Sequence, residues 1–265
     1  MFFDSHCHLS SPQLASQIGD VMQRARDANV TRVLNIADSL PNSREVLIQA
    51  QELQSRGFDI FATVGVHPQK ALEFDGSTIN ELREMAKHPL VCAIGEIGLD
   101  YVYDDGHPEY PGATREVQET VFRAQLDLAV ELNLPVVIHN READDALLKV
   151  VEDYQGKVRG VFHCFGSSTG VAMRVLALGF HLGFTGLITF KNAESVRDVA
   201  RLCPLDKTLI ETDAPYLAPV PFRGKANEPS FVPLVAKQLA EIHNLPIEEI
   251  GEITTRNACE LFGVG

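Results

Sequence analysis

Met1-Phe2-Phe3-Asp4-Ser5-His6-Cys7-His8-Leu9 opens the chain as an apolar run that ends in two histidines spaced two positions apart. Side chains alternate along a β-strand, so His6 and His8 are expected on the same side of the strand end. Two neighbouring imidazoles in that position suit a divalent metal ion. For this pair alone a capping or surface role is the alternative, and the later strand ends must decide between the two.

Short apolar segments recur along the rest of the chain and alternate with helical patterns. We predict eight strands, at Phe2–His6, Arg32–Ile36, Ile60–Val66, Val91–Gly95, Pro135–His139, Gly160–His163, His181–Gly183 and Thr208–Glu211. We predict helices at Ile18–Ala28, Ser43–Arg56, Thr78–Lys87, Arg115–Leu132, Asp144–Tyr154, Gly170–Leu178, Ala193–Leu202, Val232–His243 and Ile247–Phe262. The clearest helical pattern has an apolar face made of Val117, Val121, Ala124, Leu128 and Leu132.

Strands that alternate with helices predict parallel βαβ units. At 265 residues, eight such units close naturally into an α/β fold of the (β/α)8 TIM-barrel type. A doubly wound open sheet is the alternative, but polar residues at the ends of many different strands favour the barrel. No linker or repeat divides the chain, so we expect one domain over residues 1–265. The irregular segment Gly98–Gly112 is expected to form a loop over the site.

Composition narrows the class of protein. Hydrophobic content of 45% and charged content of 22% are ordinary for a globular protein. Five scattered cysteines without a CxxC motif, no long apolar run and no secretory signal lead us to expect a cytoplasmic location. The formal net charge of −13 argues against non-specific coating of nucleic acid. It leaves a nuclease open, because bound cations and local basic residues can offset it at the site.

Polar residues end several of the predicted strands, as His6 and His8 do. Because all carboxyl ends of barrel strands meet at one face, we expect these side chains to gather there and bind metal. Six ligands exceed what one tetrahedral zinc ion needs, and they suit two cations that share a bridging carboxylate, which Glu96 can supply. Asp213 then has two roles, as a metal ligand and as the acceptor of a proton from the attacking water. The predicted metal ligands are His6, His8, Glu96, His139, His163 and Asp213, with Glu96 and Asp213 as catalytic residues.

The polar strand ends and the loops after them lie in seven segments spread over the chain: Phe3–Leu9, Gly65–Pro68, Gly95–Tyr101, Pro135–Arg141, Phe162–Gly166, Glu211–Leu217 and Arg223–Pro229. With these segments the chain resembles the TatD family of metal-dependent deoxyribonucleases, in the amidohydrolase superfamily of barrels. The resemblance implies a two-metal barrel that hydrolyses phosphodiesters, with 3′ to 5′ exonuclease action on single-stranded DNA ends as the expected activity. It carries the ligand set onto the six residues above. Two positions depart from the family pattern, Gln69 in His67-Pro68-Gln69 and Ala226 before Asn227, and both lie in expected substrate-contact loops.

Basic residues near the strand ends are candidates for substrate contact. Arg141 follows His139 by two positions, and Arg223 and Lys225 lie in a Pro/Gly-rich loop after the last strand. A phosphate-binding role competes with a solvated surface charge for each of them. His67 either contacts substrate or supports a ligand. Glu211 is expected to support a ligand rather than bind metal directly.

Three functions remain open on the sequence alone. The first is a two-metal phosphodiesterase that acts on DNA ends, with Mg²⁺, Mn²⁺ or Zn²⁺ as the two cofactor ions. The second is an ester or amide hydrolase of the amidohydrolase type, such as an aminoacyl-tRNA deacylase. The third is an inactive metal-holding scaffold, which the complete ligand set argues against. The expected partner is nucleic acid as substrate, without a membrane or an obligate protein partner.

Overall fold

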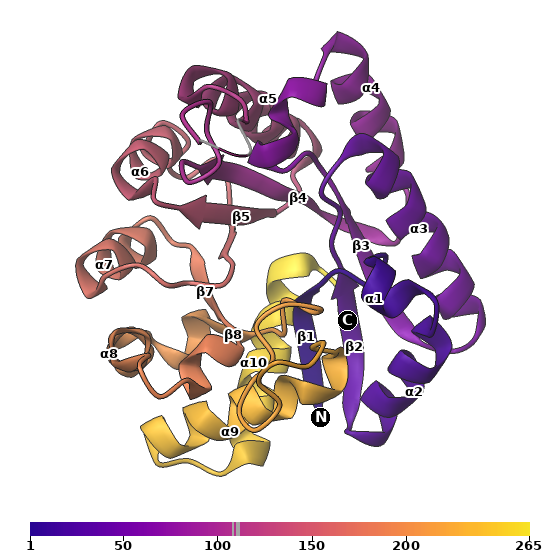
Figure 1. The fold of residues 1–265 in the computed structure, drawn as a ribbon, viewed down its shortest axis with the longest axis vertical. Helices are drawn as coiled ribbons and strands as arrows, with labels where there is room; N and C mark the ends of the chain where they lie inside the picture. Colours follow the sequence, from indigo (N-terminus) through magenta and orange to yellow (C-terminus); the bar gives the residue numbers. More distant parts are fainter. Residues whose placement is uncertain (108, 110–111) are drawn as a thin grey trace.

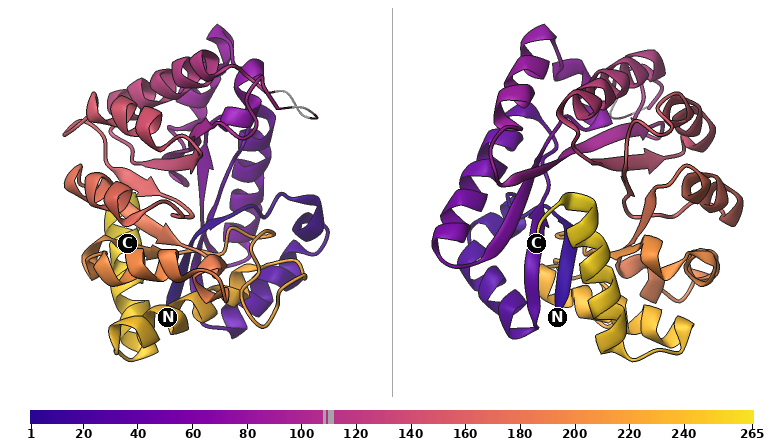
Figure 2. Two further views of the ribbon diagram at one scale, coloured as in Figure 1. Left: turned by 60° about the vertical axis from the view of Figure 1, so that its left-hand side comes forward. Right: turned by 180° about the vertical axis from the view of Figure 1, so that it is seen from behind.

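Eight parallel strands follow one another around a sheet in the order β1 to β8, each hydrogen-bonded to the next. The computed structural model describes residues 1–107, 109 and 112–265. Strands occupy the centre and helices surround them (Figures 1 and 2). The strands are β1 (Phe2–Cys7), β2 (Val30–Asn35), β3 (Asp59–Val64), β4 (Val91–Asp100), β5 (Val136–Arg141), β6 (Gly160–Phe162), β7 (His181–Phe184) and β8 (Thr208–Ile210).

The ring closes between β1 and the segment that follows β8. The backbone N–H of Asp213 donates to the carbonyl of His6 (2.8 Å), and the N–H of His8 donates to the carbonyl of Ala214 (2.7 Å). The hydroxyl of Ser5 donates to the carbonyl of Ile210 (3.0 Å). We call this junction, made by residues 5–8 and 210–214, the seam. It confirms the predicted barrel and excludes the open sheet.

Helices cover the strands from outside and one of them closes the barrel floor. The C-terminal helix α10 contacts β1 and β8, and its last residues pack with apolar side chains from the barrel interior. The helices are α1 (Pro12–Ala15), α2 (Ile18–Asp27), α3 (Leu40–Ser55), α4 (Gly76–Met85), α5 (Arg115–Leu132), α6 (Asp144–Glu152), α7 (Thr169–Ala177), α8 (Glu194–Leu202), α9 (Val232–His243) and α10 (Ile247–Phe262). The interior cluster includes Phe3, Leu34, Val137, Leu209, Leu261 and Phe262.

Helix α5 fixes two strand ends from outside through buried glutamines. The side chain of Gln118 accepts from the N–H of Asp100 (2.8 Å) and donates to its carbonyl (2.9 Å). Gln125 makes the same pair of bonds to Val66, at 2.7 and 3.0 Å. Backbone groups that run past the sheet ladder must find such partners when they are buried. The helix therefore holds in place the chain on either side of the functional site.

The predicted elements are found with their ends shifted by a few residues, and one difference matters. Strand β4 continues to Asp100 instead of ending at Gly95, and Gly98–Asp100 pair with residues 139–141 of β5. Gly98 permits this, because it has φ +145° and a Cβ there would lie 1.9 Å from the carbonyl oxygen of His139. The predicted loop therefore starts after Asp100, and Pro108, Tyr110 and Pro111 within it lie outside the described residues. The short helix α1 was not predicted.

No helix in the described part of the chain is both long enough and apolar enough to cross a membrane.

His181 is expected to make the free energy of unfolding depend on pH, independently of the polar cluster at the strand ends. It begins β7, at the barrel end opposite the strand carboxyl ends, and burial, helped by the charge of Lys207, lowers the pKa of its imidazole to about 4. The unfolded chain binds a proton at His181 near pH 6.5, so this contribution to stability is present above that pH and is lost as the pH falls towards 4. When the pH is lowered from 7 to 5, the free energy of unfolding measured with urea should fall by about 1 to 2 kcal/mol less in His181→Gln than in the native protein. An equal loss in both proteins would contradict the assignment.

Candidate metal centre

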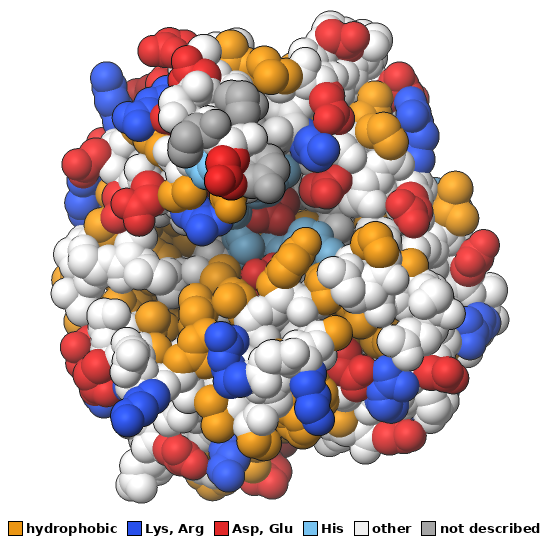
Figure 3. Space-filling view, in the orientation of Figure 1, with side chains coloured by type: hydrophobic (Ala, Val, Ile, Leu, Met, Phe, Trp, Pro, Cys, Tyr) orange, Lys and Arg blue, Asp and Glu red, His pale blue; other side chains and the backbone are white. Residues whose placement is uncertain are grey.

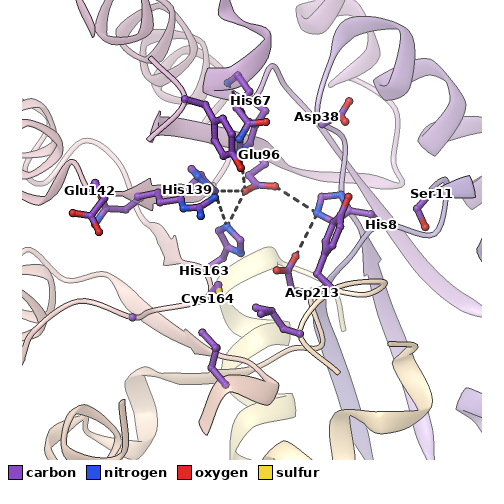
Figure 4. A pocket seen from close by; sticks show the side chains of 18 of the residues that line it. His8, Ser11, Asp38, His67, Glu96, His139, Glu142, His163, Cys164 and Asp213 are labelled. Atoms are coloured by element: carbon purple, nitrogen blue, oxygen red, sulfur yellow. Dashed lines mark hydrogen bonds and ion pairs between the residues drawn. The ribbon is translucent and has the colours of Figure 1, made fainter. Parts of the chain in front are cut away.

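Seven polar side chains, those of the six predicted ligands and His67, gather at one face of the barrel. Six of them line a cavity of about 1060 Å³, which appears in Figure 3 as a hollow floored by histidines. Five of the predicted ligands point towards one another there (Figure 4). His6 is fully buried, with its ring 5.0 Å from that of His8 and 3.9 Å from that of His163. The cavity-lining members are His8, His67, Glu96, His139, His163 and Asp213.

Glu96 stands at the centre of the cluster, between two pairs of histidines. Its Oε1 lies 2.8 Å from Nδ1 of His139 and 2.8 Å from Nε2 of His163. Its Oε2 lies 3.5 Å from Nε2 of His6 and 3.6 Å from Nε2 of His8. Oε1 also lies 3.5 Å from Nε2 of His67. Each carboxylate oxygen therefore faces its own group of imidazoles. This is the arrangement in which one carboxylate can bridge two cations.

Charge holds this buried carboxylate ionised. Burial alone would raise the pKa of Glu96, but the charges of His163 and His67, with hydrogen bonds from His139 and His163, keep it well below its usual range. Burial opposes the protonation of His163, yet the neighbouring Glu96 raises the pKa of that imidazole well above its ordinary value. A buried anion surrounded by imidazoles is stabilised either by protons on the rings or by metal ions, since both supply the compensating charge.

Two loci that share Glu96 each offer three donors to a divalent cation. His6, His8 and Glu96 place one ligand atom each within 4.8 Å of one another, and so do His67, Glu96 and His139. His6, His163 and Glu211 form a third such group, which does not include Glu96. Imidazole and carboxylate ligands with three protein donors per ion leave positions for water or substrate, as catalytic sites require. His67 was predicted to contact substrate or support a ligand, and this geometry adds direct ligation as a further possibility.

Asp213 lies beside the first of these loci. Its Oδ1 is 3.5 Å from Nε2 of His8 and 3.7 Å from Nε2 of His6. Burial would raise the pKa of Asp213, but the hydrogen bond with His8 and the charge of His6 lower it below its ordinary value. Asp213 is also 9% exposed and borders the cavity, so it reaches both a metal position and the solvent within the site.

Two carboxylates behind the cluster support its histidines. Asp4, fully buried, accepts from the N–H of Thr212 (2.8 Å) and from its hydroxyl (2.6 Å), and burial raises the pKa of Asp4 to about 8. Glu211 accepts from the N–H of Cys164 (2.6 Å) and lies 3.6 Å from Nδ1 of His163. The position of Glu211 behind His163 agrees with a supporting role. Asp4 was missed, although a carboxylate inside an apolar run was the signal that marks it.

Asp100 is a third supporting carboxylate, and its place depends on the extension of β4. Its Oδ2 lies 3.4 Å from Nε2 of His139 and accepts from the side-chain amide of Gln69 (2.9 Å). Gln69 is one of the two departures from the family pattern. In this chain it contacts the metal centre through Asp100, which orients the imidazole of His139.

The predicted basic contacts divide into two groups. Arg141 lines the cavity, with its guanidinium 5.3 Å from the ring centre of Tyr103. Arg223 instead lies over the ring of Phe190 at 3.7 Å. Lys225 has its ammonium group 5.6 Å from the ring of Phe222. Neither Arg223 nor Lys225 is among the described residues that border the cavity, so their substrate contacts stay a prediction.

Asn227 anchors the chain segment that carries Asp213. Fully buried, its side-chain amide donates to the carbonyls of Thr212 (2.8 Å) and Tyr216 (2.7 Å). Asn227→Ala leaves both carbonyls without this donor, so we expect a loss of about 2 to 4 kcal/mol in the free energy of unfolding and lower activity, because Asp213 loses its support. Urea denaturation measures the first effect. Asn80→Ala, on the exposed face of α4, is the control and should change stability little, and equal effects of the two variants would contradict the anchoring role.

Comparison with known proteins finds metal-dependent hydrolases that match over the whole chain. The model of the family described as TatD related DNase matches residues 3–263. The uncharacterized metal-dependent hydrolase YabD of Bacillus subtilis is 38% identical over the whole length of both chains. A protein of Erwinia amylovora named 3′-5′ ssDNA/RNA exonuclease TatD is 34% identical over 99% of this chain and 100% of its own.

A solved structure gives the same result for the fold. The crystal structure of YJJV, a TatD homologue from Escherichia coli K12, superimposes with a TM-score of 0.89 at 31% identity and covers 100% of this chain and 98% of its own. Sequence similarity and the barrel fold thus both extend over the whole of the two chains. The chain therefore belongs to the TatD-related DNase family of metal-dependent hydrolases.

Proposed function

We propose that this protein is a two-metal phosphodiesterase that removes nucleotides from the 3′ ends of single-stranded DNA. The observation that carries the proposal is the position of Glu96, whose two oxygens face separate pairs of histidines. Two divalent ions at such a site, Mg²⁺, Mn²⁺ or Zn²⁺, would stabilise the attacking and leaving oxygens of a phosphodiester when bound. The proposed ligands are the six predicted ones, His6, His8, Glu96, His139, His163 and Asp213.

The side chains around the cluster supply the remaining functions. Asp213 accepts a proton from the attacking water, since its lowered pKa keeps it ionised and its carboxylate borders the cavity. Asp4 and Glu211 hold the chain segments that carry Asp213 and His163. Arg141, on the cavity wall, binds a phosphate oxygen of the substrate, and a guanidinium is suited to this by its planar set of donors.

A single-stranded end fits the cavity and the charge of the protein better than a duplex does. The reactive cluster lies inside a cavity at the end of the barrel, which an end of a chain can enter. The net charge of −13 disfavours long contacts with a duplex. The name of the Erwinia amylovora relative supports the same class of substrate and direction of cleavage. A cytoplasmic location is part of the proposal and rests on the sequence features alone.

Hydrolysis of end-labelled oligonucleotides tests the proposal. Protein stripped with a chelator is mixed with single-stranded DNA labelled at the 5′ or the 3′ end, and Mg²⁺, Mn²⁺ or Zn²⁺ is added back. A metal-dependent ladder that shortens from the 3′ end is the expected result. No cleavage by protein shown to have regained its metal would overturn the proposal. Aminoacyl-tRNA would then be the next substrate to test, because the same donor set can hydrolyse carboxylic esters.

A further inference from the structure

Tyr216 is an exposed aromatic residue on a rigid backbone at the border of the cavity. Its side chain is 58% exposed, and the residue is among those that line the cavity. Its N–H donates to the carbonyl of Asp213 (2.8 Å), and its own carbonyl accepts from Asn227 (2.7 Å). The backbone is thus fixed on both sides while the ring is open to the cavity. Tyrosine is enriched at binding surfaces, because its ring supplies apolar area and its hydroxyl a polar end.

The ring lies directly beside the predicted metal ligands. Its centroid is 6.3 Å from that of His8, and the two rings meet at 68°, so the edge rather than the face of one contacts the other. In the described part of the chain no hydrogen-bond partner is found for the Tyr216 hydroxyl. The ring is not stacked face to face on His8, and it borders the same cavity as the predicted metal ligands.

Two aliphatic side chains extend this surface. Leu187 and Leu217 are partly exposed and line the same cavity. The segments that carry them are packed closely, because a Cβ on Gly186 would lie 2.2 Å from the carbonyl oxygen of Leu217. Leu217 has φ +54°, a conformation that costs free energy for a branched residue and often accompanies function. We call Tyr216, Leu187 and Leu217 the shelf.

Among the described residues, the other tyrosine that lines the cavity already has partners. Tyr103 is stacked on His107 with ring centroids 4.9 Å apart, and the guanidinium of Arg141 lies 5.3 Å from its ring. That wall therefore presents a charged group to the substrate, whereas the shelf presents an aromatic and aliphatic face. The two walls are suited to different parts of a nucleotide, the first to phosphate and the second to the base.

We propose that the shelf stacks the nucleobase next to the bond that is cut, so that the enzyme requires a base at the 3′ end while accepting any base identity. This inference rests on the proposed function. Aromatic stacking recognises every base by its π-face, and its removal by alanine substitution lowers binding roughly 5- to 100-fold per base. The class of ligand is thus a 3′-terminal nucleotide of a single strand.

Oligonucleotides with an abasic unit test the shelf. Two single strands carry a tetrahydrofuran unit in place of the terminal or the penultimate 3′ nucleotide, and kcat/KM is compared with that of the normal strand. For one of these two abasic strands, kcat/KM of the native protein should be roughly 5- to 100-fold lower than for the normal strand. Tyr216→Ala should lose the same factor on the normal strand and little more on the abasic one. Tyr216→Phe, which keeps the ring, should restore the dependence on the base.

The controls separate this inference from the function on which it rests. Met173→Ala removes a side chain that is equally exposed, on helix α7, and should behave as the native protein does. If the native protein cuts the strands but Tyr216→Ala shows the same ratio of normal to abasic cleavage, the shelf is overturned and the nuclease function stands. If the metal-loaded native protein cuts no strand, both are overturned.

Discussion

Replacing Asp213 by asparagine is expected to lower kcat about 100- to 10,000-fold, while the barrel and most of the bound metal are retained. The amide has nearly the shape of the carboxylate but cannot accept a proton from water at neutral pH. Asp213 is held by backbone bonds to His6 on one side and by Asn227 through Thr212 on the other. The fold around it therefore does not depend on its charge.

Three measurements separate this role from simple loss of the site. Metal content by elemental analysis, the thermal midpoint and the rate of oligonucleotide hydrolysis should be determined on the same preparation. Asp38→Asn makes the same change at another residue that lines the cavity and should leave kcat within a few-fold of the native value. Native turnover in Asp213→Asn would show that another group accepts the proton.

Replacing Glu96 by alanine is expected to remove metal as well as activity. The side chain is 3% exposed and is the only described residue that lies between both histidine pairs. Loss of a residue that merely supports a ligand costs about 10- to 100-fold in metal affinity or activity. A carboxylate shared by two ions should cost more than 100-fold, since its removal weakens both loci and leaves imidazoles without their buried anion.

The thermal midpoint provides an independent readout of this loss. Ions that bind only the folded state raise the midpoint, by an amount that grows with the logarithm of their affinity. Addition of Mn²⁺ or Zn²⁺ should therefore stabilise the native protein and have much less effect on Glu96→Ala. Glu142→Gln is the control, because Glu142 is an exposed carboxylate that lines the same cavity. Full metal content in Glu96→Ala would show that Glu96 does not bridge the ions.

The cluster of ligand side chains was predictable because it depends on local patterns. His6, His8 and Glu96 each follow or end an apolar strand, and parallel strands bring such ends to one face whatever the details of packing. The helix Arg115–Leu132 was predicted to the residue, since its apolar period is long and regular. The closed barrel then follows from the number of predicted βαβ units, because eight such units close naturally into a barrel.

The partners of two supporting carboxylates, Asp4 and Asp100, were not predictable in the same way. Asp4 finds its partner Thr212 at a sequence separation of 208 residues, and no local pattern contains that information. Asp100 reaches His139 only because β4 continues past Glu96 alongside β5. Arg223 lies over Phe190, a contact that depends on how two loops pack. Long-range pairing and loop packing determine these positions, and neither can be predicted from the apolar periodicity of the sequence.

The seam determines when the enzyme can first act. One proposed ligand pair comes from the first strand, and Asp213 arrives only after the eighth, so the proton acceptor meets its partners when the two sides of the seam join. Contacts between such distant parts of a chain are among the last to form, because loop closure must precede them. A chain still emerging from the ribosome thus contains histidines without a working centre. The topology thus delays the proposed nuclease activity until the two sides of the seam have joined.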